Sequence, residues 1–205
     1  KAKKVLEKEK KIGDFPYDPA FPVDTFWDLG IGDSLTIWFR QKCHGRFRYI
    51  DYLETSGSSL PDVAKKVKEK PYAYGRHILP WDAKARELGT GLTRQEILRN
   101  HDIVCEIQKR QAVDDRIQAA RNILPMCEFN LPLVERGLEC LKNYQKEWDN
   151  KLMMFKNKPK HDWSSHGADS FGYSALDNRK SHFARDRHDD LPREAVSDYD
   201  EFGSF

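Results

Sequence analysis

The sequence predicts an α/β fold in which a mixed sheet, made of an antiparallel three-strand meander and parallel strands, is flanked by helices. Three apolar segments with alternating polar positions come first and are joined by short connections, a pattern typical of antiparallel hairpins. Strand-like and helix-like segments then alternate, as they do where parallel strands pack against helices. The 205 residues are 39% hydrophobic and 12% aromatic, which is enough for the core of one domain.

The meander is expected near the start of the chain. A first strand over residues 25–29 leads into a Gly-Ile-Gly-Asp turn at 30–33. A second strand is expected over 34–42 and a third over 46–54, because apolar and polar residues alternate in both segments. One face of each strand should therefore point into the core.

Capping residues and prolines delimit the elements that follow. Ser59 is expected to cap a helix over 62–70 that ends at Pro71, and Thr93 to cap a short helix. Apolar residues at helical spacing predict three further helices. The remaining elements are expected in this order: a strand over 77–80, the short helix after Thr93, a strand over 103–107, a helix over 112–124, a long helix over 132–155, and a last helix from Ser164 or Ser165 to about residue 176.

Composition divides the chain into three parts. Residues 1–20 begin with a run of charged side chains and continue into an irregular, proline-containing stretch. Residues 21–176 contain the expected strands and helices and form the domain. Residues 177–205 are rich in Arg, Asp, His and Ser, so they are expected to be a flexible tail that takes no part in catalysis. Docking on a partner is the expected role of this tail, and an inert tail stays open as the alternative.

Overall charge, cysteine spacing and the absence of certain motifs limit the functions that the sequence is expected to have. The 35 basic and 33 acidic residues give a net charge of +2, so any basic surface for nucleic acid must be a local patch. The four cysteines are far apart and form no CxxC pair, which favours reduced thiols over a zinc site. No GxxxxGK[ST] motif and no run of apolar residues long enough to span a bilayer is present, so neither ATP hydrolysis nor membrane insertion is expected.

Three acids stand at informative places relative to the expected elements. Asp28 lies within an apolar strand, Asp82 follows the fourth strand, and Asp169 lies inside the last helix. Carboxylates bind hard cations, and two such ions about 4 Å apart stabilise both the attacking and the leaving oxygen in phosphodiester cleavage. Acids at strand ends are also common as caps or salt-bridge partners, so the placement of all three together favours a metal site.

Four segments carry a resemblance to a known family: W-D-L-G-I-G-D, I-L-P-W-D-A, D-R-I-Q-A-A-R and H-D-W-S-S-H-G-A-D-S-F-G-Y. They resemble the C-terminal nuclease domain of the large terminase subunit of tailed bacteriophages, over roughly residues 21–176. The resemblance implies a ribonuclease H-like fold and a Mg²⁺- or Mn²⁺-dependent endodeoxyribonuclease that uses two ions to cut concatemeric viral DNA during genome packaging.

The resemblance also assigns residues. Asp28, Asp82 and Asp169 match the metal-binding acids of the family, and Asp33 matches a second acid often found near the site. His166 lies three residues before Asp169 and so on the same helical face, where it is expected to be a ligand, a group that supports a ligand, or a contact to the scissile phosphate. A solvated position at the start of the helix remains equally open for His166.

Two positions depart from the family pattern. Trp81 stands where members often have a His before the second acid, and Trp has no lone pair to offer a metal. Gly172 stands where the late motif often carries a basic residue, which weakens an expected phosphate contact. Lys84 and Arg86, close after Asp82, are the expected DNA contacts.

The resemblance further implies the partners. These are double-stranded DNA, an ATPase domain N-terminal to this one in the same polypeptide, the portal protein and the small terminase subunit, at the procapsid in the host cytoplasm. A chain that begins at Lys1 rather than Met fits such a fragment. Two other interpretations stay open: a different ribonuclease H-like nuclease of the resolvase or transposase type, and a non-catalytic module that docks on the portal or capsid.

Overall fold

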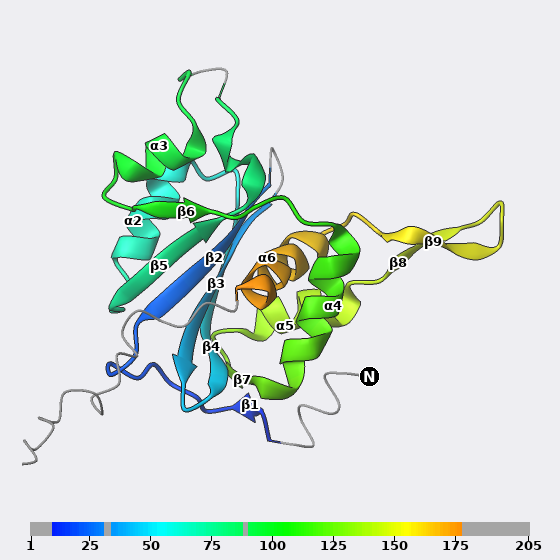
Figure 1. Cartoon of the computed structure of the whole chain (residues 1–205), viewed down its shortest axis with the longest axis horizontal. Helices are drawn as coiled ribbons and strands as arrows, with labels where there is room; N and C mark the ends of the chain where they lie inside the picture. Colours follow the sequence, from blue (N-terminus) through cyan, green and yellow to red (C-terminus); the bar gives the residue numbers. More distant parts are fainter. Residues whose placement is uncertain (1–9, 31–33, 88–89, 178–205) are drawn as a thin grey trace, which may run out of the picture.

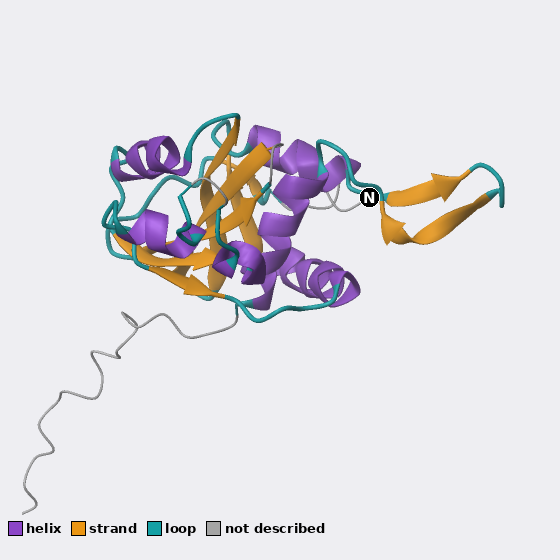
Figure 2. Cartoon of the chain, turned by 90° about the horizontal axis from the view of Figure 1, so that it is seen from above, coloured by secondary structure: helices purple, strands orange, loops and turns teal. Residues whose placement is uncertain are grey.

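A mixed sheet separates two layers of helices (Figures 1 and 2). The structure is a computed structural model that describes residues 10–30, 34–87 and 90–177. In these residues seven strands form the sheet, in the order β1-β7-β4-β3-β2-β5-β6. Their bounds are β1 Ile12–Gly13, β2 Val23–Leu29, β3 Ser34–Cys43, β4 Arg46–Ser56, β5 Tyr74–Leu79, β6 Cys105–Ile107 and β7 Cys127–Asn130.

The predicted meander is confirmed. β2 pairs with β3 and β3 with β4, both antiparallel, and Asp28 on β2 lies opposite Thr36 on β3. The alternation along β3 divides its side chains between two cores, with Ile37 and Phe39 in one and Trp38 in the other. The strand pattern in the sequence is therefore the pattern of a sheet that is buried on both faces.

Parallel strands complete both edges of the sheet. β5 runs parallel to β2 and β6 parallel to β5, as predicted. On the other edge β7 runs parallel to β4 and β1 parallel to β7, and neither strand was predicted because each is too short to show a pattern. Since Ile12 on β1 pairs with Phe129 on β7, the fold begins before residue 21, the expected start of the domain.

Helices cover both faces of the sheet (Figure 1). α2 and α3 pack on the core that contains Ile37, whereas α4, α5 and α6 pack on the core that contains Trp38. Ser59 caps α2 and Thr93 caps α3, as predicted. The bounds are α2 Leu60–Lys68, α3 Arg94–Arg99, α4 Val113–Ile123, α5 Glu135–Asn143 and α6 Ser165–Leu176, with short 3-10 helices η1 Trp81–Lys84 and η2 Leu124–Met126. None of the helices in the described ranges has the length and hydropathy of a membrane-crossing segment.

The prediction of one long helix over 132–155 was wrong. α5 ends at Asn143, and the chain continues as a hairpin of β8 (Lys146–Asp149) and β9 (Met154–Pro159) that projects from the body of the domain (Figure 2). Asp149 Oδ1 accepts the backbone N–H groups of Lys151 (2.9 Å) and Leu152 (3.1 Å), which stabilises a turn where the helix was expected. The apolar side chains of the hairpin, such as Trp148, are exposed rather than buried in the core.

Side chains of β3 hold α6 against the sheet. Three alternate residues of one strand point to the same face, and here each donates a hydrogen bond to a backbone carbonyl of α6. The bonds run from Thr36 Oγ1 to His166 O (2.9 Å), from Trp38 Nε1 to Gly167 O (2.8 Å), and from Arg40 Nη1 to Ser174 O (2.6 Å). They align the helix along β3 and so determine where Asp169 lies.

A buried ionic cluster closes the C-terminal end of α6. Asp177 accepts hydrogen bonds from Arg40 and Arg76, and Arg76 also bonds Asp24 on β2. Burial alone would raise the pKa of Asp177, but the hydrogen bond from Arg76 and the charge of Arg40 outweigh it and hold that pKa well below its usual range. Asp177 therefore belongs to the folded domain and not to the tail expected over 177–205; residues 178–205 lie outside the described part.

Candidate active site

Asp28 faces α6 because of its place on β2. Its neighbours Trp27 and Leu29 point to the opposite face, into the core that α2 and α3 cover. Asp28 Oδ2 lies 2.8 Å from Nδ1 of His166, near the start of α6, and both side chains are largely buried. An ionised carboxylate only accepts, so the Nδ1–H of His166 donates to it, which makes Nε2 of a neutral ring the acceptor nitrogen. His166 is therefore not the solvated residue that stood open as an alternative.

Asp169 lies one helical turn after His166, on the same side of α6. Its Oδ1 accepts hydrogen bonds from Arg116 Nη2 (3.1 Å) on α4 and from the Tyr144 hydroxyl (3.3 Å) that follows α5. Burial raises the pKa of Asp169, the charge of Arg116 lowers it, and the charge of Asp28 raises it again, with a net upward shift. The carboxylates of Asp28 and Asp169 are thus close enough to act on one another.

Asp82 lies on η1, directly after β5. Its Oδ1 is buried and makes no hydrogen bond within the described structure. A buried carboxylate oxygen without a partner costs about 1–3 kcal/mol. Such an oxygen is expected where a cation completes the site.

Tyr173 on α6 lies within electrostatic range of all three acids. Burial raises the pKa of Tyr173 and Arg116 lowers it, while the negative charges of Asp28, Asp169 and Asp82 each raise it further. Charges act on a group in this way only from nearby. Acids from β2, η1 and α6, which lie far apart in the sequence, are therefore all within electrostatic range of one residue.

The donor chemistry of this cluster suits a hard divalent cation. Carboxylate oxygens are the ligands that Mg²⁺ and Mn²⁺ prefer, and Asp82 Oδ1 has no hydrogen-bond partner in the described part of the chain. However, among residues 10–30, 34–87 and 90–177, no three or more His, Cys, Asp or Glu side chains come close enough together to enclose an ion. Asp28 is instead bonded to His166, and Asp169 to Arg116. The residues fit a metal site, but the carboxylates would have to move closer together to hold an ion.

The other predicted site residues lie around this cluster or outside it. Lys84 is exposed on η1, two residues after Asp82. Arg86 is also exposed, and its Nη1 donates to Gly91 O at 2.7 Å. Asp33 lies outside the described residues. Trp81 is partly exposed and packs its ring against the guanidinium of Arg110, 4.8 Å from the ring centre.

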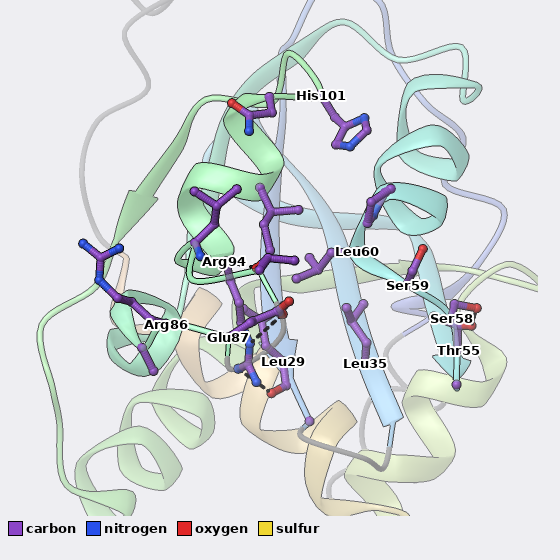
Figure 3. Close-up of a pocket in the computed structure, with 18 residues that line it drawn as sticks. Leu29, Leu35, Thr55, Ser58, Ser59, Leu60, Arg86, Glu87, Arg94 and His101 are labelled. Atoms are coloured by element: carbon purple, nitrogen blue, oxygen red, sulfur yellow. Dashed lines mark hydrogen bonds and ion pairs between the residues drawn. The ribbon is translucent and has the colours of Figure 1, made fainter.

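A hollow of about 840 Å³ lies on the other face of the sheet (Figure 3). The ends of β2 and β3, α2, α3 and the loop after η1 form its walls, with apolar side chains such as Leu29, Leu35 and Leu60. Arg94 donates to Leu29 O at 3.2 Å and pairs with Glu87 at 3.8 Å. Leu29 points into this hollow and Asp28 points the other way, so the hollow is separate from the acid cluster.

Three functional candidates escaped the sequence analysis: Arg116, Tyr144 and Tyr173. Tyr173 follows Asp169 by four residues, and this helical spacing was a signal that places it on the same face. Arg116 belongs to the D-R-I-Q-A-A-R segment that carried the resemblance, but no local pattern showed that Arg116 or Tyr144 would reach Asp169 from other parts of the chain. A Cβ at Gly172 would lie 3.2 Å from Cβ of Arg116, so the glycine lets α4 pack closely on α6.

Comparisons with known proteins agree with this architecture. No protein-family model matches the sequence, and no curated protein matches it either. The large terminase of a thermophilic bacteriophage, in complex with ADP, superposes with a TM-score of 0.63 at 16% identity, over 85% of this chain and 44% of that one. The P22 large terminase nuclease domain superposes with a TM-score of 0.57 at 14% identity, over 80% and 87%.

The nuclease domain of the large terminase from the bacteriophage SPP1, with bound Mn, superposes with a TM-score of 0.55 at 16% identity, over 79% of this chain and 92% of that one. The chain thus spans less than half of the ADP-bound large terminase but most of the isolated nuclease domains. It has the fold of the large terminase nuclease domains, which is ribonuclease H-like, and the predicted fold is confirmed.

Proposed function

We propose that this chain is a metal-dependent DNA endonuclease domain that cuts concatemeric viral DNA during genome packaging. The observation that carries the proposal is the buried Oδ1 of Asp82, which has no hydrogen-bond partner in the described structure, while Asp28 and Asp169 share with Asp82 an electrostatic effect on Tyr173. The fold is shared with nuclease domains of large terminases, one of which was solved with bound Mn. Fold alone does not establish activity, so the carboxylate cluster carries the chemical part of the argument.

Asp28, Asp82 and Asp169 would hold two Mg²⁺ or Mn²⁺ ions. When bound, such ions stabilise the attacking and the leaving oxygen of a phosphodiester. His166 orients Asp28 through its Nδ1–H, and Tyr144 orients Asp169 through Oδ1. The neighbours of each ligand thus determine its direction, as they do in well-ordered metal sites.

Lys84 and Arg86 are the proposed contacts to the DNA backbone, because both are exposed on the segment that follows Asp82. With a net charge of only +2 the domain should bind DNA weakly and with a steep dependence on salt. An ATPase domain in the same polypeptide, the portal protein and the small terminase subunit, acting in the host cytoplasm, would then keep the DNA near the site.

Cleavage of a supercoiled plasmid tests the proposal. The full chain should nick and linearise the plasmid with Mg²⁺ or Mn²⁺ and should lose this activity in EDTA. Asp28→Asn should be inactive, while Asp115→Asn, which changes an exposed acid on α4, should cut like the wild type. Cleavage that persists in EDTA would show that the metal-dependent mechanism is wrong. A preference for branched over linear DNA would favour the resolvase type.

The projecting hairpin favours a docking role in addition to cutting. Its strands and turn expose Trp148, Leu152, Met153, Met154 and Phe155, a group of apolar side chains typical of a surface that binds another protein. We propose that this surface contacts the portal protein. Leu152→Ser with Met153→Ser should leave plasmid cleavage unchanged and weaken co-sedimentation with portal rings. Unchanged co-sedimentation would rule out the hairpin as the docking surface.

A further inference from the structure

Arg116 is a buried cation whose side chain reaches from α4 to Asp169 and Tyr173 on α6. Its Nη2 donates to Asp169 Oδ1 at 3.1 Å and its Nη1 donates to the Tyr173 hydroxyl at 3.0 Å. The guanidinium carbon lies 4.8 Å from the centre of the Tyr173 ring. Both terminal nitrogens thus bond to side chains of α6, one of them a proposed metal ligand.

The surroundings of Arg116 hold its guanidinium next to Asp169 and Tyr173. The residue is only 8% exposed, so its charge is stabilised by the partners it has inside the protein. Its Nε is buried without a hydrogen-bond partner in the described structure, so the guanidinium has its contacts on the acid side. Gly172 permits the approach, because a side chain there would press on the Arg116 stem.

The contacts of Asp169 make Arg116 a competitor for a metal ion. Both hydrogen bonds described for this carboxylate, from Arg116 and from Tyr144, end on Oδ1. A divalent ion bound through that oxygen must displace the guanidinium or share the oxygen with it, and the two positive charges repel each other. Tyr144 brings a hydrogen bond without a charge and so does not oppose the ion in this way.

We infer that Arg116 is an internal counter-cation that competes with divalent metal ions for Asp169, and that it thereby determines the metal concentration at which the site fills. The inference rests on the proposed function, since it requires that Asp169 be a metal ligand. Competition and a purely supporting role of Arg116 predict opposite changes in metal affinity when Arg116 is replaced. If Arg116 only oriented Asp169, its removal would weaken metal binding; if it competes, its removal strengthens binding.

Calorimetric titration of Mn²⁺ into the full chain separates the two roles without any measurement of activity. Arg116→Gln should bind Mn²⁺ at least about tenfold more tightly than the wild type, because the repulsion between the two cations is gone. Arg116→Lys keeps the charge and should stay within about threefold of the wild type. Arg121→Gln removes the same charge from an exposed position on the same helix and should change the dissociation constant by less than about twofold.

Arg116→Met serves if the Gln variant does not fold, since its apolar stem can pack on Gly172 and the Tyr173 ring. Equal or weaker Mn²⁺ binding by the folded Gln or Met variant would overturn the inference. The proposed function is tested separately by Asp169→Asn, which should abolish the Mn²⁺ binding of the wild type. If the wild type binds Mn²⁺ through Asp169 and the Arg116 variants bind no tighter, the inference fails and the proposed function stands.

Discussion

Oδ2 of Asp28 lies 2.8 Å from Nδ1 of His166, although 138 residues separate the two in the chain. The contact joins the end of β2 to the start of α6, and Thr36 on β3 supports it by donating to the His166 carbonyl. Gly30 leaves room for the ring, since a Cβ at that position would lie 3.1 Å from His166 Cε1. The site therefore depends on how α6 is seated on the sheet.

The Asp28–His166 contact predicts a graded effect of substitutions at His166. His166→Ala removes the donor that orients Asp28 and should lower plasmid cleavage about 10- to 100-fold. His166→Asn can place an amide N–H near the same carboxylate and should recover part of the loss. The loss in His166→Ala and the partial recovery in His166→Asn are measured as cleavage rates at a fixed Mn²⁺ concentration, with circular dichroism to verify folding. Equal rates for the wild type and the Ala variant would contradict the role.

Asp28→Asn should lower cleavage more than His166→Ala does, by more than about 100-fold, because it removes a carboxylate rather than its support. The domain should stay folded, since the substitution keeps the shape of the side chain. Thermal melting checks that the variant is folded, and the plasmid assay measures its loss of cleavage, with Asp115→Asn as the control in both. Unfolding of Asp28→Asn would instead mean that Asp28 is needed for structure.

Gly137 on α5 should not tolerate a methyl group. A Cβ at this position would lie 2.4 Å from Cη2 of Trp38 and 2.9 Å from Cδ2 of Tyr52, both in the core. Gly137→Ala should lower the free energy of unfolding by about 1–3 kcal/mol, despite the gain of about 1 kcal/mol in helix propensity. Gly13→Ala, where nothing lies within 4 Å, should change it by less than about 0.5 kcal/mol in the same urea titration.

Asp177→Asn should destabilise the domain strongly. The substitution leaves Arg40 and Arg76 buried with one carboxylate fewer, at a cost of about 3–5 kcal/mol. Asp102→Asn breaks the exposed pair with Lys68 and should have a far smaller effect, because solvent screens that pair. Urea unfolding at neutral pH compares the two variants. A small effect of Asp177→Asn would mean that residue 177 is not part of the folded domain.

His77 should make the domain less stable in mild acid. Burial lowers the pKa of His77 to about 4, and the charge of Asp24 offsets only part of that shift. The unfolded chain therefore binds a proton between pH 6.5 and pH 4 that the folded chain does not, so stability is full above pH 6.5 and falls as the pH drops. The loss should amount to about 3 kcal/mol by pH 4.

His77→Gln should reduce this decrease, since Gln does not titrate, whereas His101→Gln should leave it as in the wild type. The free energy of unfolding measured in urea at several pH values tests the prediction. The same decrease in His77→Gln as in the wild type would assign the effect to other groups.

Local pattern in the sequence was sufficient for much of the fold. Alternation over the three strands of the meander, Ser59 and Thr93 as caps, and helical spacing in α6 all act between near neighbours in the chain. The three acids could be named for the same reason, because a carboxylate in an apolar strand or helix is unusual wherever it lies. Each of these features depends only on a few adjacent residues, so it can be recognised from the sequence without the tertiary structure.

Long-range contacts decided the rest. β7 is only four residues long and forms a strand because β4 and β1 pair with it, and the segment after Asn143 becomes a hairpin because Asp149 stabilises a turn and Trp148 packs on Phe155. Arg116 reaches Asp169 only once α4 and α6 have packed across Gly172. The sequence by itself singled out Asp28, Asp82 and Asp169 as candidate metal ligands. Tertiary structure decided which side chains contact Asp28 and Asp169, because those described here from other elements lie 25 to 138 residues away and no local pattern records that distance.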